Sequence, residues 1–130
     1  MILLDTHVII WLLLAPEKLS RTAREAILHA RRNAETIGYS HVSIYEIANA
    51  VRRGRLVVFS GVEDFASAVQ GKFTVAPLTA QIAICAGQLA EPFHGDPLDR
   101  IIAATAIVNG CTLITRDEKI REANLCKTLW

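Results

Sequence analysis

The most restrictive feature of this sequence is the alternation of short apolar runs with longer segments of helical periodicity. The first run, Ile2–Leu4, is too short for a helix and ends at an acidic residue, so it predicts a buried β-strand. Further strands are expected at Thr36–Tyr39, Phe73–Ala76 and Cys111–Ile114, with a last short strand near Cys126–Leu129. Short apolar strands separated by helices are typical of an α/β sandwich with a mainly parallel sheet.

Most of the expected helices begin at a capping residue, and several carry an apolar stripe. Helices are expected over Val8–Leu14, from Ser20 to about Arg32, from Ser43 to Gly54, from Ser60, from Thr79 to about Ala90, and from Asp96 to Asn109. Ser43 and Glu46 have the spacing of a capping box. Asp96 is followed by Pro97, the residue favoured at the first helical position. The preceding segment, Glu91–Asp96, is expected to be a loop because it contains proline and glycine.

Composition excludes several classes of protein. The 130 residues suit one domain, 1–130, and 14 basic against 13 acidic residues give a net charge of +1. That balance excludes a simple polycationic nucleic-acid binder. The longest apolar run, Val8–Ala15, falls well short of the roughly 20 residues that a membrane span needs. Three cysteines without C-x-x-C spacing, Cys85, Cys111 and Cys126, favour reduced thiols in a cytoplasmic protein.

Four acidic residues fall at the ends of expected strands or at the starts of the helices that follow. Asp5 ends the first strand, and Asp117 follows the Cys111–Ile114 strand. Glu46 and Asp99 are expected in the first turns of two helices. Because these ends share one edge of a parallel sheet, the carboxylates are expected to converge there. Converging carboxylates repel each other unless a hard divalent cation lies among them, with Mg²⁺ or Mn²⁺ the first candidates.

Each acidic residue also has a purely structural interpretation. Glu46 completes a capping box, Asp96 is most simply an N-cap, and Asp99 interacts favourably with the helix dipole. Asp117 suits a turn or an N-cap. Asp5 is the hardest to explain structurally, because an unpaired charge directly after a buried strand is costly.

Four motifs together resemble the PIN-domain proteins, and most closely the VapC-like toxins of toxin–antitoxin pairs. They are Met-Ile-Leu-Leu-Asp-Thr-His at 1–7, Ser-Ile-Tyr-Glu-Ile at 43–47, His-Gly-Asp-Pro-Leu-Asp-Arg-Ile-Ile-Ala-Ala-Thr-Ala at 94–106 and Leu-Ile-Thr-Arg-Asp at 113–117. Each motif alone is weak, but the four occur in the family's order and span essentially the whole chain.

The resemblance implies a three-layer α/β/α sandwich and a Mg²⁺-dependent endoribonuclease in which metal-activated water attacks an RNA phosphodiester. It implies that Asp5 and Asp99 are the most direct metal ligands, with Glu46 and Asp117 completing the site. Thr6 and Thr115 match hydroxyl positions beside these acids. Asp96 is an additional acid, interpreted first as a cap and second as a site member. The implied partners are an RNA substrate, a cognate antitoxin and a second copy in a homodimer.

Several residues allow two interpretations. Arg100 and Arg116 lie next to the expected site acids and suit either RNA phosphates or salt bridges to those acids. His7 suits a structural role or donation to a phosphate, as do His41 and His94. Trp11 suits the core, or alternatively an antitoxin groove or dimer face.

Three other functions compete with the ribonuclease hypothesis. One is a catalytically silent PIN-like module that only binds RNA or a partner. A second is a DNA-cleaving relative, because the same carboxylate chemistry acts on either sugar. A receiver-like signalling domain is disfavoured, because it needs an acidic pair after its first strand and Asp5 stands alone there.

Overall fold

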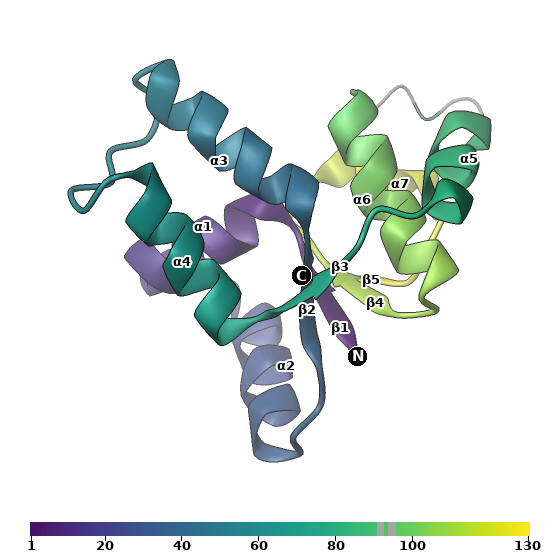
Figure 1. Cartoon of the computed structure of the whole chain (residues 1–130). Helices are drawn as coiled ribbons and strands as arrows, with labels where there is room; N and C mark the ends of the chain where they lie inside the picture. Colours follow the sequence, from purple (N-terminus) through teal and green to yellow (C-terminus); the bar gives the residue numbers. More distant parts are fainter. Residues whose placement is uncertain (91–92, 94–95) are drawn as a thin grey trace.

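A computed structural model describes residues 1–90, 93 and 96–130 of the chain (Figure 1). The strands are β1 (Ile2–Leu4), β2 (Ile37–Ser40), β3 (Thr74–Ala76), β4 (Thr112–Ile114) and β5 (Thr128–Leu129). The helices are α1 (Thr6–Leu14), the 3₁₀ turn η1 (Pro16–Lys18), α2 (Arg21–Arg32), α3 (His41–Arg52), α4 (Val62–Lys72), α5 (Ala80–Gln88), α6 (Pro97–Val108) and α7 (Glu118–Ala123).

The strands form one parallel sheet in the order β3-β2-β1-β4-β5. Leu4, the last residue of β1, pairs with Tyr39 of β2 on one side and with Ile114 of β4 on the other. The chain therefore runs outward from β1 to β3 and then returns to β4 on the opposite side of β1. In open sheets of this kind, ligand sites lie beyond the carboxyl ends of the strands where the order reverses. That point lies between β1 and β4.

Helices cover both faces of the sheet, so the molecule has the expected three layers (Figure 1). Successive residues of a strand point to opposite faces. Ile2 and Leu4 accordingly pack in a cluster with α1, α2, α3 and α4, whereas Leu3 packs with α6 and α7. Residues of α5 and α6 form a third, smaller apolar cluster around Ile82. The expected α/β/α sandwich with a parallel central sheet is confirmed.

The expected start of the third helix is wrong. The helix begins at His41, where Ser40 is the N-cap and accepts a hydrogen bond from the backbone N–H of Val42. Glu46 therefore lies in the second turn of α3, beyond the reach of a capping box. The motif misled because Ser43 has the right spacing from Glu46, although it is fully buried inside the helix.

The other boundaries differ by small shifts. α1 begins at Thr6 because Asp5 caps it, two residues before the expected start. The turn η1 was not expected, and the short helix α7 was anticipated only through the N-cap interpretation of Asp117, because neither carries an extended apolar stripe. Within the expected Glu91–Asp96 loop, residues 91–92 and 94–95 lie outside the described part of the chain. No described helix is long and apolar enough to cross a membrane.

The end of α2 allows a test of backbone strain. The N–H of Glu35 donates to the carbonyl of Ala30 at 2.8 Å, and Ala34 lies between them with a positive φ of 51°. α6 ends in the same hydrogen-bonding pattern, but there Gly110 holds the position with φ 59°. Glycine reaches this conformation without the penalty that a Cβ imposes.

We therefore expect Ala34→Gly to stabilise the protein by about 0.5–1 kcal/mol, which is the left-handed penalty less the entropy of an added glycine. Gly110→Ala is the matched reverse change and should destabilise it by about 1 kcal/mol. Urea denaturation midpoints measure both changes. A lower midpoint for Ala34→Gly would contradict the assignment of strain to this turn.

Candidate active site at the carboxyl ends of β1 and β4

Asp5 is buried directly after β1, and hydrogen bonds hold both of its carboxylate oxygens. Oδ1 accepts from the backbone N–H of Thr6 at 2.7 Å, and Oδ2 accepts from the hydroxyl of Thr115 at 2.6 Å. The residue is only 3% exposed. These bonds offset the cost of burying a charge and fix the orientation of the carboxylate at the centre of the sheet edge.

Thr115 also joins Asp5 to the segment after β4. Its hydroxyl oxygen accepts a hydrogen bond from the backbone N–H of Asp117 at 3.0 Å. The Asp117 carboxylate in turn accepts from the backbone N–H of Ile120 at 3.0 Å and so caps α7. The expected capping role of Asp117 is confirmed, and one hydroxyl connects the two predicted site segments.

A second hydroxyl connects α1 to α3. The Thr6 side chain donates to Oε1 of Glu46 at 2.6 Å and lies 3.0 Å from the hydroxyl oxygen of Ser43. Burial raises the pKa of Glu46, the bond from Thr6 lowers it, and the nearby charges of Asp5 and Asp96 raise it again. Glu46 thus lies within electrostatic range of Asp5, although 41 positions separate them in sequence.

Asp99 lies in the first turn of α6 and faces the same edge of the sheet. Its pKa is raised to about 7, first by burial and then by the negative charges of Asp96, Asp5, Glu46 and Asp117. An N-terminal helix position normally favours an ionised aspartate, so repulsion and burial outweigh the helix dipole here. The predicted site acids therefore interact with one another across four separate segments of the chain.

Asp96 has the expected N-cap role. Its carboxylate accepts from the backbone N–H groups of Leu98 at 2.9 Å and Asp99 at 3.0 Å. Because its charge also raises the pKa values of Asp99 and Glu46, it contributes to the field of the site as well as to the helix.

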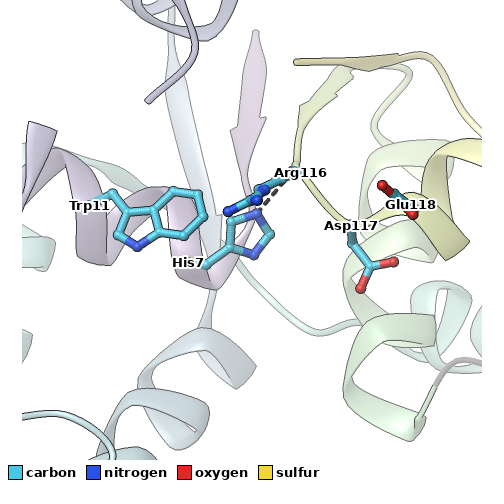
Figure 2. A pocket seen from close by; sticks show the side chains of 5 residues that line it. All are labelled: His7, Trp11, Arg116, Asp117 and Glu118. Carbon is cyan, nitrogen blue, oxygen red and sulfur yellow. Dashed lines mark hydrogen bonds between the residues drawn. The ribbon is translucent and has the colours of Figure 1, made fainter. Parts of the chain in front are cut away.

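His7 is held in one neutral tautomer. Its Nε2 accepts a hydrogen bond from the backbone N–H of Arg116 at 2.9 Å, so the ring proton is on Nδ1 (Figure 2). Nδ1 lies 3.5 Å from Oδ2 of Asp5. Burial lowers the pKa of His7 despite the opposing charges of Asp5 and Asp117, and Arg116 lowers it further. These contacts favour the structural interpretation of His7 over donation to a phosphate.

The two arginines beside the acids differ from each other in their contacts. Arg100 points its three nitrogens at backbone carbonyls: Ala86 at 3.0 Å, Phe93 at 2.9 Å and Leu89 at 2.8 Å. It therefore joins α6 to the end of α5, and the expected phosphate or salt-bridge role is wrong. Arg116 is exposed and makes no ion pair within the described residues; its guanidinium carbon lies 5.7 Å from the centre of the Trp11 ring.

The other two candidate histidines have different outcomes. His41 is exposed at the start of α3, with its ring edge-on to Tyr39 at 6.0 Å. His94 lies outside the described residues.

The carboxylates suit a hard divalent cation in their chemistry. Within residues 1–90, 93 and 96–130, no three His, Cys, Asp or Glu side chains are arranged to hold one metal ion among themselves. Mg²⁺, however, is usually bound through one or two carboxylates together with water and substrate phosphates. From the residues that the structure describes, each oxygen of Asp5 accepts one hydrogen bond and so retains a lone pair for such an ion. The residues present therefore fit a cation that is shared with a phosphate.

Sequence reasoning missed the position of Ser43 beside the acidic residues and the packing around Trp11. The position of Ser43 had no local signal, because its partner Thr6 is 37 positions away and its spacing to Glu46 indicated a capping box instead. The packing around Trp11 had no sequence signal, because Trp130 is 119 positions away and still lies 5.7 Å from Trp11 between ring centres.

Fold and site together define a parallel α/β protein with interacting carboxylates at the switch point of its sheet. Residues 2–124 match the PIN domain family, and the chain belongs to that family. It is 32% identical over 120 residues to Ribonuclease VapC22 of Mycobacterium tuberculosis, which covers 92% of this chain and 89% of that relative.

Two solved structures share the fold. One is VapBC2 from Rickettsia felis bound to a DNA fragment from its promoter, with a TM-score of 0.73, 18% identity, and coverage of 99% of this chain and 98% of that one. The other is a toxin–antitoxin complex from Klebsiella pneumoniae, with a TM-score of 0.67, 20% identity, and coverage of 100% and 97%.

Proposed function

We propose that this protein is a Mg²⁺-dependent endoribonuclease and the toxin of a toxin–antitoxin pair. The observation that carries the proposal is the pair of threonine bridges at the sheet edge. Thr115 links Asp5 to the backbone of Asp117, and Thr6 links Asp5 to Glu46. The relative named as a ribonuclease, which is similar over most of both chains, supports the same activity.

In this proposal Asp5 and Asp99 hold the cation most directly, and Glu46 and Asp117 complete the site. All of these ligands are carboxylates, the donors that Mg²⁺ and Mn²⁺ prefer. When bound, such an ion neutralises charge on the scissile phosphate and lowers the pKa of a coordinated water.

The contribution of the protein itself is to hold the carboxylates in position before the substrate arrives. Asp5 has no freedom to turn, because Thr6 and Thr115 bind opposite oxygens. The Thr6 hydroxyl likewise holds one oxygen of Glu46, and among the described residues no hydrogen bond holds Oε2. Such preorganisation lowers the reorganisation that is needed when charge develops in the transition state.

The proposed partners follow from the same assignment. The solved structures that share the fold include complexes described as VapBC2 and as toxin–antitoxin complexes. We expect an antitoxin to bind this chain, a second copy to form a homodimer with it, and the protein to act on RNA in the cytoplasm.

The test is cleavage of single-stranded RNA by the wild type and by Asp5→Asn. We expect cleavage in Mg²⁺ or Mn²⁺ and none in EDTA, with Asp5→Asn slower by about 1,000-fold, since a lost metal contact costs several kcal/mol of transition-state stabilisation. Asp64→Asn on the exposed face of α4 makes the same chemical change away from the site and should cleave like the wild type.

Equal cleavage rates for Asp5→Asn and the wild type would contradict the proposed ribonuclease site. Binding of Mg²⁺ without turnover would instead support the catalytically silent module. A matched single-stranded DNA substrate distinguishes the DNA-cleaving alternative.

A further inference from the structure

A pocket opens beside the acidic edge of the sheet and shares one of the carboxylates just described, that of Asp117. It has a volume of about 260 Å³ and is lined by His7, Trp11, Arg116, Asp117 and Glu118 (Figure 2). That volume is near the lower end of the range for ligand sites, about 300 Å³. It suits one flat, small group rather than an extended ligand.

Two lining residues, His7 and Trp11, belong to an aromatic cluster that Trp130 completes outside the pocket. His7 lies 5.0 Å and Trp130 lies 5.7 Å from Trp11, measured between ring centres. The His7 ring is held by the backbone of Arg116, so it cannot turn away from Trp11 without losing that hydrogen bond. Trp11 is only half-buried, and the side of its ring toward the pocket is in reach of a ligand.

Arg116 provides the positive charge of the pocket. Its guanidinium lies over the Trp11 ring at 5.7 Å, and Figure 2 shows the two side chains facing one another. The side chain is exposed and makes no ion pair within the described residues, so it can adjust to a ligand at little cost. An indole face opposite a guanidinium plane is a combination that stacks on nucleobases.

The pocket is contiguous with the candidate active site. Asp117 lines it, and the charge of the same residue raises the pKa of Asp99. A base held against Trp11 therefore leaves its own phosphate close to the acidic edge.

We propose that this pocket binds the base of an unpaired nucleotide next to the scissile phosphate, with Trp11 as the stacking surface and Arg116 as its cationic cover. The proposal rests on the proposed ribonuclease function and adds the substrate class to it. Single-stranded RNA is favoured over duplex, because only an unstacked base can enter.

Binding is measured in EDTA, where no cleavage is expected, with a short fluorescein-labelled single-stranded RNA. Trp11 and Trp130 are the two tryptophans of the chain and lie in this cluster, so their intrinsic fluorescence reports the pocket. We expect RNA to quench that fluorescence saturably, and a matched duplex to quench it far less.

Trp11→Leu keeps an apolar side chain but removes the stacking surface, and we expect about a tenfold loss of RNA affinity. Trp11→Phe keeps an aromatic ring and should stay within about threefold of the wild type. Arg116→Ala should lose about tenfold, whereas Arg53→Ala, which removes the same charge from the exposed end of α3, should lose no more than about twofold. Thermal melting confirms that each variant is folded.

Unchanged affinity of Trp11→Leu, or unchanged tryptophan fluorescence at saturating RNA, would overturn the proposal. So would a Trp11→Leu variant that loses binding to a co-expressed antitoxin while keeping its RNA affinity, because the pocket would then bind a protein side chain. Cleavage in Mg²⁺ is scored separately. If the wild type binds RNA through Trp11 but does not cleave it, the proposal for the pocket stands and the proposed ribonuclease activity is contradicted.

Discussion

Replacing Asp99 with asparagine is expected to stabilise the metal-free protein and, in the same variant, to remove RNA cleavage. The wild-type carboxyl is half-buried among four other carboxylates, so ionising it in the folded state costs free energy. Asparagine has nearly the same shape and no charge. The cleavage rate should fall by about 1,000-fold, because a proposed direct ligand of the cation is lost.

The stabilisation should depend on pH in a defined direction. The pKa of Asp99 is about 7 in the folded protein against an ordinary value of 3.8. Between those values the folded state binds a proton that the unfolded state has released, so the stability of the wild type falls as pH rises from about 4 to about 7. Above pH 7 the penalty is fully present, and below pH 4 it disappears.

Melting temperatures of the two proteins in EDTA at pH 4 and pH 8 check this prediction. We expect Asp99→Asn to melt a few degrees higher than the wild type at pH 8, since partial exposure screens the repulsion, and to melt at the same temperature at pH 4. Added Mg²⁺ should raise the melting temperature of the wild type more than that of the variant. A variant that is less stable at pH 8 would contradict the repulsion between these carboxylates.

Arg100→Ala is expected to have the largest effect on stability of any single arginine substitution discussed above. The guanidinium donates to the carbonyls of Ala86, Leu89 and Phe93, and its carbon lies 5.9 Å from the centre of the Phe93 ring. Hydrogen bonds to a charged group contribute about 1.5–3 kcal/mol each, and they are not additive. We expect a loss of about 3 kcal/mol, a large part of the 5–15 kcal/mol typical of a domain.

Urea denaturation measures the loss, and Arg55→Ala, at an exposed arginine, provides the control and should change stability by less than about 0.5 kcal/mol. Arg100→Lys should recover only part of the stability, because an ammonium group cannot reproduce the planar fork. An Arg100→Ala protein as stable as the Arg55→Ala control would show that these carbonyls do not depend on the guanidinium.

The residues of the candidate site could be predicted from the sequence more completely than the contacts that support them. Asp5 and Asp117 follow strands whose parallel pairing was expected, so their shared edge followed from the fold class. Arg100 illustrates the opposite case. Its neighbour Asp99 faces the site, whereas Arg100 turns toward α5, and nothing in the sequence distinguishes a phosphate ligand from a helix connector.

The sequence by itself determined what depends on contacts within a few residues. Asp96 caps α6 because the N–H groups it binds belong to Leu98 and Asp99, which follow it directly. The apolar Ile2–Leu4 run had to be a buried strand, because it is too short for anything else. Local hydrogen bonding and burial were sufficient for these decisions.

Only the tertiary structure decided which distant residues meet. Ser43 has a local capping-box partner in the sequence, but it lies beside Thr6, because the order β3-β2-β1-β4-β5 brings α3 next to α1. Trp11 packs against Trp130 for a related reason. Trp130 directly follows β5, and β5 pairs with β4 in the sheet. Such contacts follow from strand order and helix packing, which are properties of the whole chain and not of any one segment.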